Sequence, residues 1–418
     1  MASALDRFEV WVDAASPESR LVVFGMCLPE RQIAAIDQLA NGRRKQCDVV
    51  RIVVEHPAGR RPFVKPGLVA ALNVEFREMD APFADRLARA SAAAGATLLA
   101  LQGDSIVDSR VLRALLTGSG ALVAVGSEGP RRTALIRLAP QQRAAAGDDA
   151  LAVGAALVAS GAARELALES LGTHIRALRR DLAAYAFRLP ESEVAETERW
   201  LFWSNYKGST DFLTRWVFPP LVWAAVRPLA RWRVHPNWVT GLAVLLCVAA
   251  VPLWASGAWL LGFAAAYVMA VLDSVDGKLA RLTYTTSLFG NVLDHGTDLI
   301  HPPFWYAAWA WGLAGGPHGA TFALTLWFFA IYLADRALAR VFKVVSGKSI
   351  HGYAPIDVKM RTFISRRNVN LPVFTLALPL GLGAEAIALV VAWQVACLAF
   401  HAVRLAQVWR ARLRAVSS

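Results

Sequence analysis

Long apolar runs with almost no charge fill the second half of the chain, and they constrain the fold more than any other feature. A helix needs about 20 apolar residues to cross a bilayer. Six segments are candidates for such helices, at 237–256, 259–281, 288–313, 320–341, 369–383 and 385–407. The fifth is short and contains Pro372 and Pro379. The pattern predicts an α-helical integral membrane domain of six transmembrane helices, over residues 237–410.

The loops between these segments differ in charge, and this difference predicts an orientation. Three loops are short and nearly uncharged, whereas the other set is rich in Arg and Lys. Basic loops stay in the cytoplasm. We therefore expect a multi-pass protein of a bacterial-type inner membrane, with both termini cytoplasmic. The first ten residues hold no apolar signal stretch, so residues 1–185 are also expected to be cytoplasmic.

The net charge of +12 allows partners of three kinds: nucleic acid, an anionic membrane surface or an anionic substrate. Nucleic acid is disfavoured, because the basic residues cluster between apolar segments. The four Cys residues have neither metal-ligand spacing nor the pattern of a disulfide framework. Zinc and structural disulfides are therefore not expected.

A segment rich in Trp and Arg precedes the first predicted span. Residues 210–237 mix Trp, Phe and Leu with spaced Arg and are interrupted by Pro219 and Pro220. This composition favours an amphipathic helix lying in the membrane interface. The alternative is an ordinary linker helix packed on the N-terminal domain. In either case residues 186–236 are expected to be the linker between the two domains.

Four carboxylates lie within the predicted spans, where a charged side chain is costly. Asp273 and Asp276 are three residues apart near the end of the second predicted span, and Asp294 and Asp298 are four apart near the start of the third. Each spacing puts a pair on one helix face, and only the short turn LTYTT separates the two helices. We expect the four side chains to converge in one pocket near the cytoplasmic boundary.

Converging carboxylates repel each other unless cations neutralise them. Oxygen ligands suit Mg²⁺, Mn²⁺ or Ca²⁺, and paired metals are a common device for displacement at phosphate esters. Gly277 and Gly290 leave room for a bulky phosphate beside the acidic residues, and Arg281 can hold a phosphate oxygen. The alternative is a solvated helix–turn–helix surface. Ionisable residues near membrane depth favour function.

The pattern Asp273-x2-Asp276-Gly277-x2-Ala280-Arg281-x8-Gly290-x3-Asp294-x3-Asp298 resembles the signature of the CDP-alcohol phosphatidyltransferases at every fixed position. The stretch HPNWVT resembles the start of the family's first span. The resemblance covers about residues 205–410.

This resemblance implies a site and a reaction. Two divalent ions, Mg²⁺ or Mn²⁺, would be held by Asp273, Asp276, Asp294 and Asp298, and Asp298 would be the catalytic base. The CDP pocket would be formed by Gly277, Ala280, Arg281, Gly290, Asn237 and Thr240. A CDP-linked donor and an alcohol or alcohol-phosphate acceptor would give a phosphodiester and CMP, as in phospholipid biosynthesis. A homodimer is also implied.

An acceptor phosphate needs a cation outside the metal pocket. The candidates are Arg336, Arg340 and Lys343 at the end of the fourth predicted span, and Arg361, Arg366 and Arg367 before the fifth, with Arg336 favoured. The alternative for most of them is positive-inside charge in contact with anionic lipid. His295 and His301 lie near the acidic residues, but a structural role is favoured for both, since the signature requires neither.

Residues 1–185 alternate short apolar runs with helical patterns, which predicts a soluble α/β Rossmann-like domain with parallel strands. The stretches CLPERQIAAIDQLANG and LLALQGDSIVDSRVLRALL resemble parts of the sugar-phosphate nucleotidyltransferases. In that family an Asp at the position of Asp104 binds the catalytic metal. The family's Gly-rich loop after the first strand is missing, so we expect a catalytically degenerate domain. Asp104 would then only cap the following helix.

Two alternatives to a transferase using a donor such as CDP-diacylglycerol stay open. One is synthesis of a polyol phosphodiester from a CDP-polyol, by analogy with fused inositol-phosphate enzymes. The other is an ion transporter built on carboxylates. A transporter would place charges at mid-bilayer on several helices, whereas these acidic residues lie near one end of one helix pair.

Overall fold

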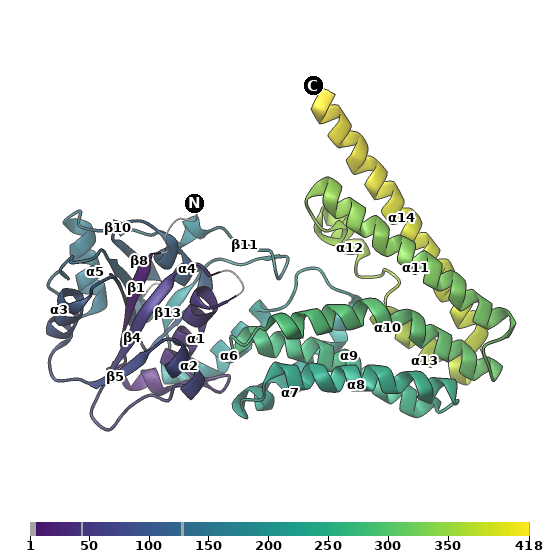
Figure 1. The fold of residues 1–418 in the computed structure, drawn as a ribbon, viewed down its shortest axis with the longest axis horizontal. Coiled ribbons are helices and arrows are strands. Elements are labelled where there is room, and N and C mark those ends of the chain that lie inside the picture. Colours follow the sequence, from purple (N-terminus) through teal and green to yellow (C-terminus); the bar gives the residue numbers. More distant parts are fainter. Residues whose placement is uncertain (1–5, 43–44, 127–128, 418) are drawn as a thin grey trace.

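The computed structural model describes residues 6–417 apart from 43–44 and 127–128; the side chains of residues 130, 294–295 and 415–417 are not described either. The chain forms an α/β domain followed by a helical domain, which lie side by side (Figure 1).

Seven strands of the described residues form one mixed sheet in the first domain. Their order is β10 (Arg164–Glu165), β8 (Leu122–Gly126), β9 (Thr133–Leu138), β6 (Thr97–Gln102), β1 (Arg7–Asp13), β4 (Asp48–His56) and β5 (Val74–Glu78). β1 pairs in parallel with both β4 and β6, and β4 with β5, whereas β9 runs antiparallel to β6 and β8. The predicted α/β domain with parallel strands is confirmed, with one antiparallel strand inserted.

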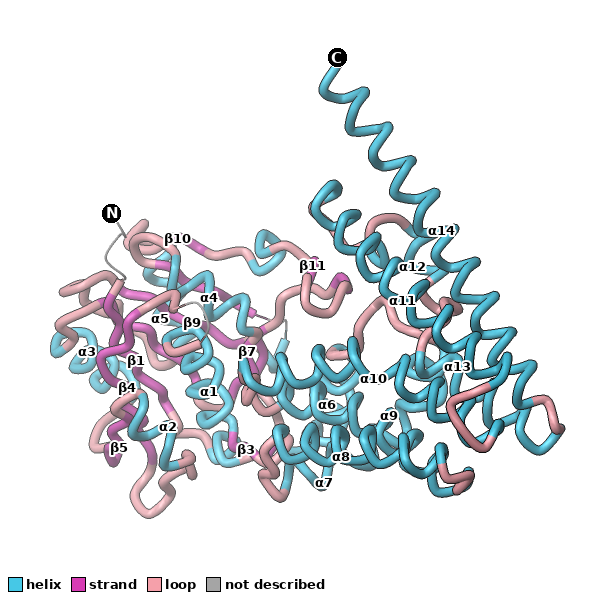
Figure 2. The backbone as a smooth tube through the Cα atoms, turned by 45° about the vertical axis from the view of Figure 1, so that its right-hand side comes forward, coloured by secondary structure: helices cyan, strands magenta, loops and turns pink. Residues whose placement is uncertain are grey.

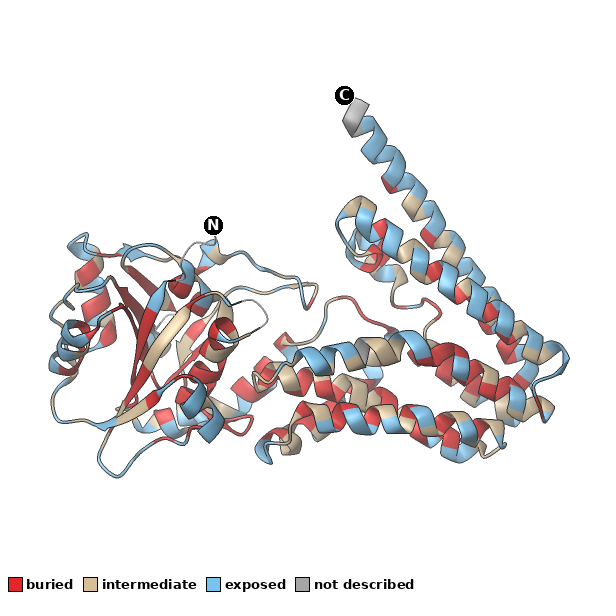
Figure 3. Cartoon of the chain, viewed as in Figure 1, coloured by how far each residue is buried: buried red, intermediate tan, exposed pale blue. Residues whose placement is uncertain are grey.

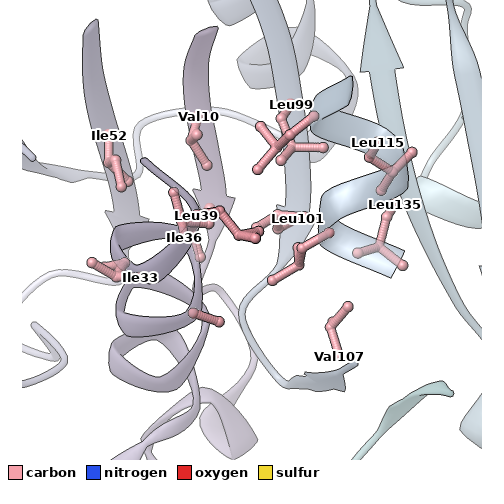
Figure 4. Packing of buried hydrophobic residues seen from close by; sticks show 14 of the residues in the cluster. Val10, Ile33, Ile36, Leu39, Ile52, Leu99, Leu101, Val107, Leu115 and Leu135 are labelled. Atoms are coloured by element: carbon pink, nitrogen blue, oxygen red, sulfur yellow. The ribbon is translucent and has the colours of Figure 1, made fainter. Parts of the chain in front are cut away.

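Alternating side chains on the strands fill two cores, one on each face of the sheet. On β1, Phe8, Val10 and Val12 belong to one core and Trp11 to the other. Ile33 and Leu115 pack on the first face (Figure 4). The helices of this domain are α1 (Leu28–Ala40), α2 (Pro66–Ala71), α3 (Phe83–Ala93), α4 (Ser109–Thr117) and α5 (Ala150–Ala159).

Secondary structure continues into the segment predicted as the linker. The smaller strand pairs are β2 (Val22–Val23) with β3 (Met26–Cys27), β7 (Ser105–Val107) with β13 (Ala186–Arg188), and β11 (His174–Ile175) with β12 (Arg180–Asp181). The β13 strand therefore ties residues 186–188 to the first domain, and α6 (Val194–Ser204) follows it.

The Trp- and Arg-rich segment is helical and packs on the first domain. A short π-helical turn, η5 (Leu213–Val217), runs into α7 (Phe218–Arg231). Val222 and Val226 are buried in a core that also contains Phe24 of the first domain. Trp216 and Trp232 are exposed. One face of the segment therefore packs on the first domain, as the linker alternative expected, and the interfacial role of the exposed Trp residues stays a prediction.

The helical domain begins at His235, whose ring Nδ1 accepts a hydrogen bond from the Asn237 amide and caps the first long helix. Its helices are α8 (Pro236–Ala255), α9 (Trp259–Leu282), α10 (Leu288–Ala314), α11 (Gly319–Ser346), α12 (Pro355–Met360), α13 (Arg367–Ala377) and α14 (Gly383–Ser417). Helices α8, α9 and α10 run side by side, and α11 packs along α14 at an angle to them (Figures 1 and 2).

Of the described helices, α8, α9, α11 and α14 are long and apolar enough to cross a membrane. Many residues along these helices are exposed (Figure 3). They include apolar residues such as Leu245 and Trp327, as expected for contact with lipid. Helix α10 has 27 residues, so it also has the length. Helix α13 has only 11 residues, or about 16 Å, too short to cross alone. The predicted count of six spans is thus not confirmed.

Buried ion pairs and hydrogen bonds join the two domains. Arg233, just before α8, makes two contacts of 2.7 Å with the carboxylate of Glu30 on α1. Arg31 donates to the carbonyl oxygen of Leu282 at 2.9 Å. Gly25 packs so closely that an added Cβ would lie 2.1 Å from the carbonyl oxygen of Ala230. The first domain is therefore docked on the end of the helical domain that carries the acidic residues.

Candidate active site

A cavity of about 590 Å³ lies at this end of the helical domain. Its walls come from α8, α9, α10 and α11, from the segment between α12 and α13, and from the β11–β12 hairpin of the first domain. Of the residues predicted for the metal and CDP sites, those with described side chains all line it: Asp273, Asp276, Asp298, Gly277, Ala280, Arg281, Gly290, Asn237 and Thr240. The structure thus brings together segments that are far apart in the sequence.

Two of the carboxylates converge on a single cation. Arg367, at the start of α13, donates from Nη2 to Asp273 at 2.8 Å and from Nη1 to Asp298 at 2.9 Å. Its side chain is 9% exposed. Asp273 comes from α9 and Asp298 from α10; both helices pack on α8, and the Arg367 side chain links their two carboxylates. A buried guanidinium with two carboxylate partners is well compensated.

The third described carboxylate is held more deeply. Asp276 is buried and accepts a hydrogen bond of 2.6 Å from the Thr240 hydroxyl of α8. Asn237, one turn earlier, accepts a hydrogen bond of 3.1 Å from Ser287. An added Cβ on Gly290 would lie 2.9 Å from Oδ1 of Asn237. A side chain at position 290 would therefore disturb this wall.

The side chains of Asp294 and His295 lie outside the described residues; the backbone places both on α10. Among described side chains, no group of three or more His, Cys, Asp or Glu residues is arranged to hold a metal. The carboxylates of Asp273 and Asp298 nevertheless share one positive partner, and Asp276 lines the same cavity. Such an all-oxygen donor set fits a divalent ion of the Mg²⁺ or Mn²⁺ type.

Four of the five arginines predicted for an acceptor phosphate line the cavity, namely Arg336, Arg361, Arg366 and Arg367. Arg340 is not among the described residues that line it. The Nε atoms of Arg336 and Arg361 are buried without hydrogen-bond partners among the described residues. Burial and then the charge of Arg366 hold the pKa of Arg361 well below its ordinary value. This end of the cavity has an excess of positive charge.

His301 also lines the cavity, but its Nδ1 lies 2.7 Å from the carbonyl oxygen of Thr297 in its own helix. That contact agrees with the structural role favoured from the sequence.

Arg367 has a different role from the one expected. The sequence placed it among the candidates for an acceptor phosphate, whereas the structure pairs it with Asp273 and Asp298. Its neighbours Asn368 and Asn370 are both buried, and a run of polar residues at a span entrance is the signal that identifies it. Asn368 in turn donates to Thr214 at 3.1 Å, so the segment is fixed to η5.

In the first domain, the Asp104 carboxylate is paired with Arg188, whose Nε lies at 2.8 Å. The prediction that Asp104 caps the following helix is wrong. Asp108 caps α4, since its side chain accepts a hydrogen bond of 2.8 Å from the Arg110 amide. The helix begins four residues later than expected, because the short strand β7 intervenes.

The helical domain has four described helices that are long and apolar enough to cross a membrane, and carboxylates and arginines both line its cavity. Residues 233–401 match the family model of CDP-alcohol phosphatidyltransferases, so the chain contains a domain of this family. Cholinephosphotransferase 1 of Gallus gallus is 36% identical over 103 residues, which are 22% of this chain and 30% of that protein. An uncharacterised CDP-alcohol phosphatidyltransferase class-I family protein of Schizosaccharomyces pombe is 27% identical over 118 residues, 24% of this chain and 30% of that protein.

The matched segments thus span about three tenths of the length of these curated relatives. Among solved structures, the inositol-1-phosphate CTP transferase from T. maritima matches with a TM-score of 0.26 at 13% identity, over 38% of this chain and 84% of that chain. A likeness this weak carries no argument, so the nucleotidyltransferase resemblance of the first domain remains a prediction.

Proposed function

We propose that this protein is a membrane CDP-alcohol phosphotransferase, which moves a substituted phosphate from a CDP-linked donor to the hydroxyl of an alcohol or alcohol phosphate and releases CMP. One observation carries the proposal: the signature residues of α8, α9 and α10 line the same cavity as Arg336, Arg361 and Arg366. An acidic wall suits a cation-bound diphosphate, and a basic wall suits an anionic acceptor.

In this proposal Asp273, Asp276, Asp294 and Asp298 would hold one or two divalent ions, which would neutralise the donor's diphosphate when bound. Asn237 and Gly290 form the part of the wall that the nucleotide would approach, because glycine leaves the space that a side chain would fill. Thr240 keeps Asp276 oriented through its 2.6 Å hydrogen bond.

The reaction needs a base for the acceptor hydroxyl. Asp298 would take that proton as the hydroxyl oxygen forms a bond to the phosphorus of the donor and the bond to CMP breaks. Arg367 holds Asp298 at 2.9 Å and would keep it ionised before the acceptor enters, since a nearby positive charge favours the carboxylate form. Arg367 is therefore proposed as a positioning residue.

The proposed setting follows from charge. The arginine-lined end of the cavity and both termini would face the cytoplasm, where a nucleotide donor is soluble. A lipid tail on the donor or acceptor would extend between the helices into the bilayer. The first domain would be catalytically degenerate, since Arg188 already neutralises Asp104. A homodimer is proposed from the family resemblance.

The test is CMP release by the full-length protein in detergent with Mg²⁺ or Mn²⁺, using CDP-diacylglycerol or a CDP-polyol against a panel of alcohols and alcohol phosphates. CMP and a phosphodiester of matching mass should form together with one pair. If folded, metal-loaded protein gives no CMP with any pair, the proposed function is wrong.

A further inference from the structure

The β11–β12 hairpin reaches from the first domain to the cavity in the helical domain. Arg176, Ala177 and Arg179 lie in the turn between its two strands, and all three line the cavity. The sequence analysis assigned no role to this segment. Its position raises the question of why a domain without a complete site of its own should contribute side chains to a cavity in another.

Several contacts fix this hairpin in place. The Gly208 amide donates to the carbonyl oxygen of Leu178 at 2.8 Å, and Arg180 donates to the carbonyl oxygen of Trp203 at 2.8 Å. An added Cβ on Gly208 would lie 2.4 Å from the carbonyl oxygen of Arg179. The hairpin therefore packs tightly on the segment that leads into the helical domain.

Arg179 is held in an unusual state. Its backbone φ is +50°, a left-handed conformation that costs a non-glycine residue roughly 1 kcal/mol or more. Its side chain is half-buried, and Nη1 is buried without a hydrogen-bond partner among the described residues. Burial and then the charge of Arg366 lower the pKa of Arg179. The packing of the hairpin holds the backbone strain, and the unpartnered Nη1 is a donor that an anion can satisfy.

The charges around Arg179 leave it uncompensated. Arg336, Arg361 and Arg366 line the same cavity. Asp335 is buried and already contacts both His401, at 2.6 Å, and Arg336, at 3.1 Å. Asp211 accepts hydrogen bonds of 3.0 Å from the amide and from the hydroxyl of Thr214. Asp335 therefore offsets part of the charge of Arg336, whereas none of the ion pairs found among the described residues involves Arg179, Arg361 or Arg366. Together the four guanidinium groups line one cavity.

We infer that Arg179 completes an anion site at the acceptor end of the cavity, so that the first domain is part of the transferase active site, and that the acceptor is a phosphorylated alcohol. This inference rests on the proposed function for the acceptor's role, but the anion site stands on the arginine cluster itself. A phosphate with three acceptor oxygens matches convergent guanidinium groups. The hairpin serves as a fixed rim of the site.

The test compares Arg179→Gln and Arg179→Lys with Arg113→Gln, a control on the exposed face of α4. CMP release is measured with glycerol 3-phosphate and inositol 1-phosphate, and with glycerol and inositol. Arg179→Gln should raise KM for the phosphorylated acceptor about tenfold or more, the size expected for loss of a charged hydrogen bond. The KM for the donor should stay within about twofold. Arg179→Lys should recover part of the loss.

A second measurement does not need turnover. Inorganic phosphate should raise the unfolding temperature of the wild type and of Arg113→Gln, but less so that of Arg179→Gln. If wild type releases no CMP yet shows this difference, the proposed function fails and the anion site stands. If Arg179→Gln matches wild type in acceptor KM and in phosphate stabilisation, the inference is wrong. Equal loss with phosphorylated and unphosphorylated acceptors would also overturn it.

Discussion

Replacing Gly290 by Ala separates a structural role from a substrate-binding role. Gly290 is in the first turn of α10, and its amide donates to the Ser287 side chain at 3.0 Å. The new Cβ would lie 2.9 Å from Oδ1 of Asn237 and 3.0 Å from Oγ of Ser287. Both distances are shorter than ordinary carbon–oxygen contacts, so the Asn237 and Ser287 side chains must move.

The expected change in stability is small because two effects oppose each other. Loss of the helix cap costs about 1 kcal/mol, and Ala stabilises a helix by up to about 1 kcal/mol relative to Gly. The free energy of unfolding should therefore change by less than about 1 kcal/mol. Binding of the donor should suffer more, because displaced Asn237 intrudes on the cavity. Losing one good hydrogen bond there, about 1.4 kcal/mol, raises the donor KM about tenfold.

The assay is CMP release against donor concentration, beside thermal unfolding in the same detergent. The matched control is Gly241→Ala on α8, where an added Cβ meets nothing within 4 Å; it should leave both measurements near wild type. A fully active Gly290→Ala protein would refute the placement of the donor in this cavity. A loss of stability of several kcal/mol would refute the reasoning that the two local effects cancel.

Three further predictions follow from the contacts. Arg367→Lys offers one point charge to two carboxylates, so CMP release should fall by about tenfold or more with the donor KM little changed. Arg233→Met leaves the buried Glu30 carboxylate without its cation and should lower the free energy of unfolding by about 3 kcal/mol. Limited proteolysis should then separate the two domains sooner than in the wild type. Burial lowers the pKa of His235 below 6.5, so the unfolded chain takes up its proton first and stability falls as pH drops through 6.5. His235→Asn, a cap that does not titrate, should show a smaller drop in unfolding temperature between about pH 7.5 and pH 5.5.

Local patterns in the sequence were sufficient for much of this structure. Apolar length predicted α8, α9, α10, α11 and α14 to within a few residues at most ends, because a run of this kind has few other stable forms. The spacing of Asp273, Asp276 and Asp298 predicted a shared cavity, since it puts acidic residues on one face of each helix close to the turn that joins them. Strand–helix alternation predicted the sheet of the first domain.

Features that depend on tertiary contacts were missed. The chain leaves the helix after Ala377, so α13 is shorter than its apolar stretch suggested, with Pro379 in the turn that follows. The role of Arg367 depends on two carboxylates that are 94 and 69 residues away in the chain. The pairing of Asp104 with Arg188 requires the β7–β13 strand pair. The pattern of apolar and polar residues within one segment does not show which distant residues that segment will contact.

The central claim is that the carboxylate cavity transfers a substituted phosphate, and Asp298→Asn tests it most directly. CMP formation and CDP-donor binding should be measured side by side on wild type and variant, with metal in excess. The account predicts that CMP formation falls by about a hundredfold or more while the variant stays folded and still binds the donor. CMP formation at the wild-type rate in this variant would contradict the account.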